Sequence, residues 1–130
     1  MNTRITEAIN FNEITSILLS IGYMVYRPEA DVDGVDFIVQ TPSGDILKCQ
    51  LKSRAYVEWD RYGGKNIFMV FPSKGEKKQR NWYFIEHDKL FNILKKLHGH
   101  APKWSDKGGF WHCEVGPKLA EIIEDSKITV

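Results

Sequence analysis

The sequences VDFIVQ at residues 35–40 and ILKCQLK at residues 46–52 decide the fold of this chain. Both are rich in β-branched and apolar residues, and the residues TPSGD at positions 41–45 between them are turn formers. This pattern is typical of a β-hairpin. We therefore predict two antiparallel strands that are joined by the loop at residues 41–45.

The predicted pairing places three polar side chains on one face of this hairpin. If the loop closes symmetrically about Ser43, Asp36 lies opposite Gln50. Opposed residues share a face of the sheet, as do residues two apart on one strand, so Asp36, Gln50 and Lys52 gather on one side. A register shift of one residue would separate them. The odd-numbered positions form an apolar face suited to a core: Phe37, Val39, Leu47, Cys49 and Leu51.

The rest of the chain mixes helical and strand patterns. A helix is predicted from about residue 3 to residue 21 and ends at Gly22. Strands are predicted at residues 23–26, 66–71, 82–85 and 110–115, and residues 53–65 are expected to form a polar and aromatic loop. Asp88 is a plausible N-cap for a helix that ends before Gly99, and Pro117 begins a last short helix with Leu119, Ile122 and Ile123 facing inward.

Length and composition indicate one domain over residues 1–130, because 130 residues with 42% hydrophobic side chains suffice for a real core. The sequence has no run of about 18 apolar residues and no signal-peptide pattern, so we expect a cytoplasmic protein without a membrane partner. Its two cysteines, Cys49 and Cys113, do not make a disulfide framework, and reduced thiols are expected.

Positive charge is concentrated in the middle of the chain, although the net charge is only +1. Residues 46–107 hold 14 of the 18 lysines and arginines but only 6 of the 17 acidic residues. Such a segment can face a polyanion such as a nucleic-acid backbone. An ordinary solvated surface is the simpler explanation of a charge run taken alone.

The polar face of the predicted hairpin suits phosphodiester hydrolysis, which needs an activated water, a Lewis acid and positive charge near the phosphate. Asp36 would bind a divalent cation directly, together with the side-chain oxygen of Gln50 and the backbone carbonyl of Leu51. Lys52 would orient or deprotonate the water and stabilise charge on the phosphate. Ligation by oxygen alone favours Mg²⁺, with Mn²⁺ as a substitute.

A glutamate of the first helix is a candidate for the same site. Glu7 projects near the centre of the apolar face of that helix, whereas Glu13 lies at its flank, and a carboxylate on a core-facing stripe needs a partner, a metal or water. Glu7 would complete the carboxylate set if the helix packs over the polar face of the hairpin. Alternatively, the helix begins later, capped by Asn12, and Glu7 belongs to a solvated end.

These residues resemble the PD-(D/E)xK nuclease superfamily, in which an Asp opens one strand and an acidic residue or Gln, any residue and Lys lie on the next. Here DGVDFIV at residues 33–39 and QLKS at residues 50–53 follow a helix that ends at Gly22 and Tyr23. They are most similar to the branch with Gln in place of the second acid, which includes a small group I intron homing endonuclease and bacterial and phage nucleases. The resemblance covers about residues 5–55.

The resemblance implies an α/β, restriction-endonuclease-like core, with a central mixed β-sheet flanked by helices, and a Mg²⁺-dependent deoxyribonuclease activity. Asp36 and Gln50 would be metal-site residues and Lys52 the active lysine. The helix glutamate of the family maps near Phe11 or Asn12, neither of which is acidic. Glu7 or Glu13 must therefore serve, or the ligand is missing.

DNA is the expected partner. A small domain presents one active site, so cleavage of both strands would require a homodimer or homotetramer. Basic residues after the proposed site and near the tip of the predicted 66–85 hairpin are expected to position the DNA backbone. They are Arg54, Arg61, Lys65, Lys74, Lys77, Lys78 and Arg80.

Three alternatives compete with a nuclease. The chain could keep the nuclease scaffold without catalysis and bind nucleic acid or a protein partner, as the unmatched helix glutamate suggests. An unrelated α/β domain would place Asp36 and Lys52 far apart. A zinc site from His98, His100, His112 and Cys113 lacks the usual ligand spacing.

Overall fold

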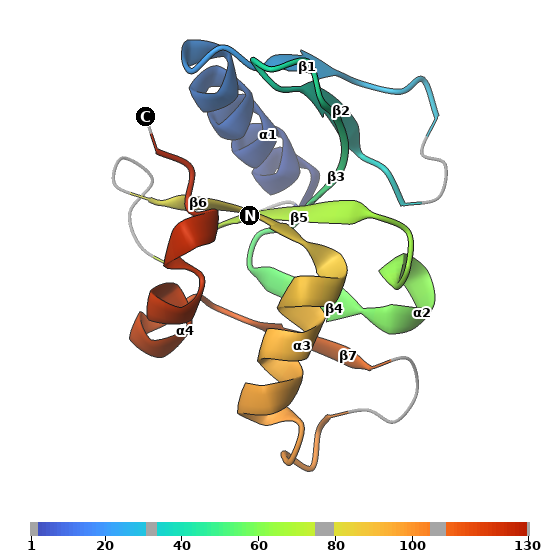
Figure 1. The fold of residues 1–130 in the computed structure, drawn as a ribbon, viewed down its shortest axis with the longest axis vertical. Helices are drawn as coiled ribbons and strands as arrows, with labels where there is room; N and C mark the ends of the chain where they lie inside the picture. The colour runs from blue at the N-terminus through green and yellow to red at the C-terminus, as the bar shows by residue number, and fades with distance from the viewer. Residues whose placement is uncertain (1–2, 31–33, 75–79, 105–108, 130) are drawn as a thin grey trace.

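The computed structural model describes residues 3–30, 34–74, 80–104 and 109–129 (Figure 1). The chain begins with helix α1 (Thr3–Ser20) and strands β1 (Met24–Tyr26), β2 (Phe37–Gln40) and β3 (Ile46–Leu51). Strand β4 (Ala55–Glu58) and helix α2 (Trp59–Tyr62) lead to strands β5 (Ile67–Pro72) and β6 (Trp82–Glu86). Helix α3 (His87–His98), strand β7 (Phe110–Cys113), helix α4 (Pro117–Ile122) and the 3-10 turn η2 (Glu124–Ser126) follow.

A mixed sheet lies at the centre of the fold, in the strand order β1-β2-β3-β5-β6. Strands β3 and β5 are parallel, and the other neighbours are antiparallel. The β3–β5 crossover carries β4 and α2, and β4 pairs with β7 in a second, two-stranded sheet. Helix α1 lies on one side of the central sheet, and α3 and the second sheet lie on the other (Figure 1). The predicted central mixed sheet flanked by helices is therefore confirmed.

The β2–β3 hairpin has the predicted register. Phe37 pairs with Cys49 and Val39 with Leu47, as expected for closure about Ser43. The turn is held by the backbone bond from Thr41 N to Asp45 O, and Gly44 adopts a φ of 96° that side chains rarely tolerate. Because the register matches, Asp36 and Gln50 lie on the face opposite the apolar residues.

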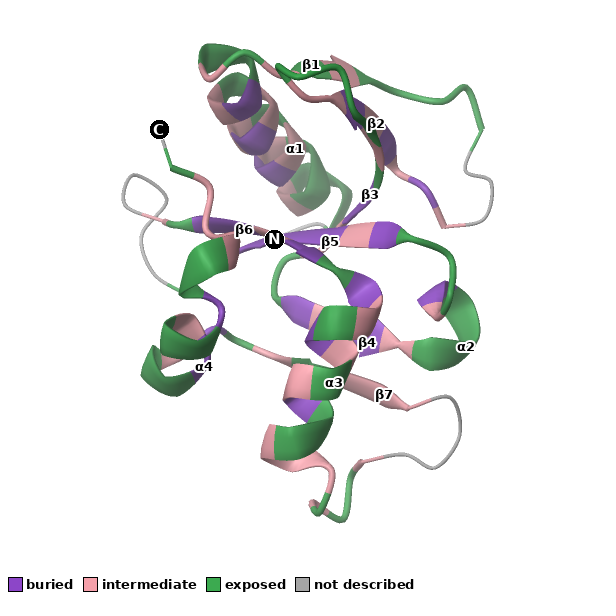
Figure 2. Ribbon diagram, in the orientation of Figure 1, coloured by how far each residue is buried: buried purple, intermediate pink, exposed green. Residues whose placement is uncertain are grey.

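Two apolar cores lie on the two sides of the central sheet. Helix α1 packs Ile14 and Leu18 in one core with Phe37, Val39 and Cys49, which are fully buried, and with Leu47 and Leu51, which are partly buried. The larger core joins β5 and β6 to α3, α4 and β4, with Met69 and Leu90 among its buried members. Figure 2 shows that both α1 and β2 carry buried residues. Helix α1 therefore covers the apolar face of the hairpin, not its polar face.

Several elements differ from the sequence prediction. Residues 55–62, expected in a loop, form β4 and α2, because β4 pairs with strand β7 from far along the chain and Ala55 and Val57 are buried in the larger core. Helix α3 begins at His87, so Asp88 is not its N-cap. Ile122, expected to face inward, is 45% exposed. Helix α1 begins at Thr3, so the alternative start at Asn12 is wrong.

No helix within the described ranges is both long enough and apolar enough to cross a membrane.

Candidate active site

A cleft of about 540 Å³ opens between the first turns of α1 and the ends of β2 and β3. It is lined by all five residues that the sequence assigns to the reaction site: Glu7, Asp36, Gln50, Leu51 and Lys52. Lys52 therefore lies beside Asp36, and not far from it as an unrelated fold would place it. Three arginines from separate segments, Arg4, Arg27 and Arg61, also line the cleft.

Asp36 is anchored by two hydrogen bonds to strand β3. Its backbone N–H donates to Cys49 O at 2.8 Å, and its Oδ2 accepts a bond from Leu51 N at 2.9 Å. The first bond goes to Cys49, the partner of Phe37, and ties Asp36 to β3 just before β2 begins. The second holds the carboxylate against the end of β3, next to the other candidate ligands.

Gln50 lines the cleft, and its side-chain oxygen is unsatisfied among the described residues. The residue is only 5% exposed, and its Oε1 atom accepts no hydrogen bond from any residue that the structure describes. Leaving such a buried acceptor unsatisfied costs about 1–3 kcal/mol. A ligand that accepts electron density from this oxygen, such as a cation, would remove that cost.

Lys52 lies half-buried at the same cleft. Its Nζ lies 4.1 Å from the ring centroid of Tyr56 and 5.8 Å from that of Tyr62. Burial lowers the pKa of the Lys52 amine, and the positive charge of Arg61 lowers it further, against the opposing effects of Asp36, Glu58 and Glu7. An amine with a lowered pKa is a better proton acceptor near neutral pH than an ordinary lysine.

The structure separates the two candidate glutamates of α1. Glu7 is exposed and lines the cleft, and its charge acts on Lys52. It reaches the cleft from the first turns of α1, although the helix covers the other face of the hairpin. Glu13 instead accepts hydrogen bonds from Arg80 and Trp82 and does not line the cleft. Of these two residues, only Glu7 lies at the site.

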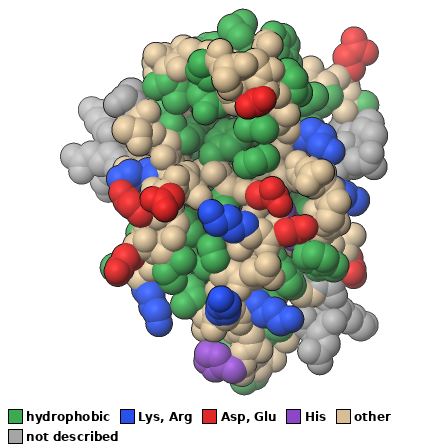
Figure 3. All heavy atoms as spheres, viewed as in Figure 1, with side chains coloured by type: hydrophobic (Ala, Val, Ile, Leu, Met, Phe, Trp, Pro, Cys, Tyr) green, Lys and Arg blue, Asp and Glu red, His purple; other side chains and the backbone are tan. Residues whose placement is uncertain are grey.

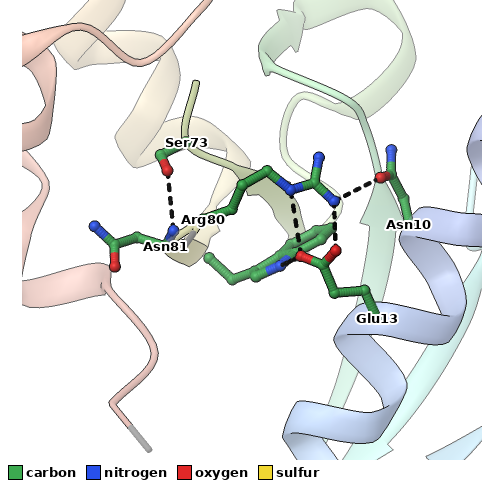
Figure 4. Close-up of polar contacts among 6 residues, drawn as sticks. Asn10, Glu13, Ser73, Arg80 and Asn81 are labelled. Carbon is green, nitrogen blue, oxygen red and sulfur yellow. Dashed lines mark hydrogen bonds and ion pairs between the residues drawn. The ribbon is translucent and has the colours of Figure 1, made fainter. Parts of the chain in front are cut away.

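The Arg80 side chain does not extend to an exposed hairpin tip as the sequence predicts. It is 12% exposed, and its Nη2 lies 2.8 Å from Glu13 Oε1 and 2.9 Å from Asn10 Oδ1 (Figure 4). Arg80 thus ties α1 to the start of β6. Lys74 is exposed and pairs with Glu114 at 3.6 Å, and the predicted Lys77 and Lys78 lie outside the described residues.

Among the other predicted basic residues, only Arg61 lines the cleft; Arg54 and Lys65 are exposed elsewhere. Basic and acidic side chains are interspersed on the face seen in Figure 3. The basic residues that are concentrated in the middle of the sequence therefore do not form one continuous basic patch on that face.

Sequence reasoning missed Arg4 and Arg27. Arg27 follows β1, and its guanidinium lies 4.0 Å over the Phe11 ring. Tyr26 pairs with Ile38, so the antiparallel register continues toward Arg27 opposite Phe37, the residue after Asp36, but the sequence alone does not specify this pairing. Arg4 belongs to the first turn of α1, whose direction over the sheet no local pattern specifies.

The donor set at the cleft fits a hard divalent cation. A carboxylate from Asp36, the unsatisfied amide oxygen of Gln50 and the Leu51 carbonyl are all oxygen donors, and Glu7 is a further carboxylate in the cleft. No group of three or more His, Cys, Asp and Glu residues is placed to hold a metal within the described part of the chain. Uncharged oxygen atoms would therefore supply many of the ligands of a bound cation.

His87 is a buried residue that the sequence did not single out. It is 1% exposed, its Nε2 accepts a bond from Glu58 N at 3.0 Å, and its Nδ1 therefore donates to Asp88 Oδ1 at 2.9 Å. Asp88 also accepts from Gly64 N at 3.1 Å. Burial lowers the pKa of His87 despite the neighbouring Asp88, so the imidazole that makes these bonds is neutral. The hydrogen bonds of His87 and Asp88 fix β4 and α2 to α3.

Lowering the pH is expected to destabilise the protein through His87. Because its pKa is lower in the folded than in the unfolded chain, the unfolded chain binds the proton more readily, and this stability is lost as pH falls below about 6.5. His87→Gln cannot take up the proton, so its melting temperature should fall less than that of the wild type between about pH 7.5 and pH 5.5. Thermal unfolding followed by circular dichroism measures this.

The exposed His100 provides the matched control for that titration. His100→Gln should keep the pH dependence of the wild type, because that side chain is exposed. Equal pH dependence in the wild type and His87→Gln would contradict the role given to His87.

Comparison with known proteins identifies the fold as one that an endonuclease also adopts. No family model matches the sequence, and no curated protein sequence is similar to it. A solved structure with a similar fold is that of the bacterial homing endonuclease I-Ssp6803I, at a TM-score of 0.55 and 15% sequence identity. The match covers 96% of this chain and 94% of that chain. At this identity, the likeness shows a shared fold.

Proposed function

We propose that this protein is a metal-dependent endonuclease of the PD-(D/E)xK type, the Gln variant, that hydrolyses phosphodiester bonds of DNA. The observation that carries the proposal is the meeting of Asp36, the unsatisfied Gln50 oxygen and the Lys52 amine in one cleft. The fold shared with a homing endonuclease supports it.

Asp36, Gln50 and the Leu51 carbonyl would hold the cation, with Glu7 as a direct or water-mediated ligand. Mg²⁺, or Mn²⁺ in its place, would polarise the scissile phosphate and lower the pKa of a bound water. The bond from Leu51 N holds the Asp36 carboxylate in place. Because Gln50 is buried, packing within the sheet sets the orientation of its amide oxygen, and bulk water does not.

Lys52 has two roles that its environment supports. Its lowered pKa increases the fraction of neutral amine, whose Nζ can accept a proton from the attacking water. In its charged form, the same group stabilises the negative charge that develops on the phosphate. Arg61, Arg27 and Arg4 lie at the cleft, where they would contact phosphates of the DNA backbone and position it.

Cleavage of both strands of a duplex needs two such sites. One cleft in a chain of this size holds one set of ligands, so we propose that a homodimer or homotetramer acts on duplex DNA. Sedimentation velocity with and without a short duplex measures this assembly.

A Mg²⁺-dependent plasmid assay tests the proposed function. Supercoiled DNA should be converted to nicked or linear forms with Mg²⁺ or Mn²⁺ and should remain intact with EDTA. Cleavage that persists in EDTA would contradict the metal requirement. No cleavage with either ion, over a range of ionic strengths, would contradict the nuclease assignment.

One observation favours a second candidate, a nuclease-fold module that binds nucleic acid without cutting it. Glu7 is exposed and Asp36 is the only anchored carboxylate among the described residues of the cleft, so the negative charge available to a cation is small. This candidate predicts salt-dependent DNA binding without specific Mg²⁺ affinity. Isothermal calorimetry with Mg²⁺ alone distinguishes the two functions.

A further inference from the structure

Lys52 meets an aromatic surface that comes from outside the hairpin. Its backbone N–H donates to Val70 O on β5 at 2.9 Å, and this bond fixes the position of the main chain. The side chain is not fixed by that bond, because it has four rotatable bonds of its own. The Nζ lies 4.1 Å from the centroid of Tyr56, within the range of a cation–π contact. Tyr62 borders the same amine at 5.8 Å.

The Tyr56 ring is itself held on several sides. Its hydroxyl donates to Glu58 Oε1 at 2.8 Å, and its ring packs edge-on against Phe110 at 5.2 Å. It stacks with His112 at 6.3 Å, the residue opposite it in the β4–β7 pair. A ring with these contacts has little freedom to turn, so it is a rigid support for a flexible amine.

The Tyr56 ring belongs to the second, two-stranded sheet of the fold. Among the described strands, β4 pairs only with β7, and the bond from Glu58 N to His87 Nε2 ties its end to α3. The position of the ring therefore depends on residues that lie about 30 to 60 positions beyond Lys52 in the sequence. None of these residues lines the cleft.

We propose that Tyr56 is a positioning residue of the active site, whose ring face holds the Lys52 amine at the cleft while the β4–β7 sheet holds the ring. The catalytic part of this inference rests on the proposed nuclease function. The contact itself does not, and it has a spectroscopic signature that is independent of cleavage.

Proton NMR tests the contact directly. Protons over the face of an aromatic ring are shifted upfield, so the ε-methylene protons of Lys52 should resonate upfield of those of the exposed Lys48 and show nuclear Overhauser effects to the Tyr56 ring. A Lys52→Met variant assigns the signals. Tyr56→Phe should keep the shift because it keeps the ring, and Tyr56→Leu should lose it. Tyr26→Leu, at an exposed tyrosine of β1, is the matched control and should keep it.

Cleavage kinetics test the positioning role. Tyr56→Leu should lower kcat by about 10- to 100-fold with KM nearly unchanged, because a displaced amine still permits DNA binding. Tyr56→Phe should retain most of the wild-type kcat, and Tyr26→Leu all of it. Equal kcat in Tyr56→Leu and the wild type would overturn the role.

The NMR result remains decisive if Tyr56→Leu fails to fold. Ordinary Lys52 shifts in the wild type, without Overhauser effects to Tyr56, would overturn the proposal whatever the activity. A wild-type protein that shows the shift but cuts no DNA would refute the nuclease function, and with it the positioning role of Tyr56 in catalysis, but not the contact between Tyr56 and Lys52. The two failures are therefore distinguishable.

Discussion

Asp36→Asn is expected to reduce metal-dependent DNA cleavage by at least about 1,000-fold, because it removes the negative charge that would hold the cation in the proposed site. Asparagine keeps a side-chain oxygen that can accept the Leu51 N–H, so the hairpin should fold as before. The variant should also lose Mg²⁺ binding in calorimetry. Single-turnover cleavage at increasing Mg²⁺ concentration measures both effects, since weakened binding would be partly rescued by excess metal.

Asp45→Asn is the matched control for this change. Asp45 lies in the exposed turn of the same hairpin, where its carboxylate accepts a bond from Ser43, away from the cleft. It should leave cleavage and Mg²⁺ affinity unchanged. Wild-type cleavage by Asp36→Asn at every metal concentration would refute the assignment of the site.

Lys52→Met is expected to lower kcat by about 100- to 10,000-fold, the usual contribution of a positioned acid or base. Methionine keeps much of the aliphatic side chain but has no amine to accept a proton or to stabilise the phosphate. KM should change little, because the arginines of the cleft remain. The melting temperature should not fall, since a half-buried charge is removed.

Lys48→Met separates this effect from a general loss of positive charge. Lys48 lies on β3, which ends just before Lys52, at an exposed position outside the cleft. Its replacement should leave kcat unchanged. If both lysine variants lose activity equally, the reaction depends on overall charge and not on the Lys52 amine.

The candidate site could be predicted from sequence to the extent that local pairing builds it. The turn at residues 41–45 and the alternation of Phe37, Val39, Leu47 and Cys49 specify one register, and this register brings Asp36 and Gln50 to the same face. Glu7 could not be chosen over Glu13 in this way. That choice depends on the direction in which α1 crosses the sheet, which the Arg80–Glu13 pair helps to hold.

The hairpin, its register and the convergence of Asp36, Gln50 and Lys52 follow from the local sequence, because a strand period of two and a short turn act over neighbouring residues. The direction of the Arg80 side chain, the arginines that reach the cleft and the contact of Tyr56 with Lys52 depend on the tertiary structure. These features rest on partners far apart in the chain, such as β4 with β7 and Glu58 with His87. Packing energy selects such partners, and no local pattern encodes that choice.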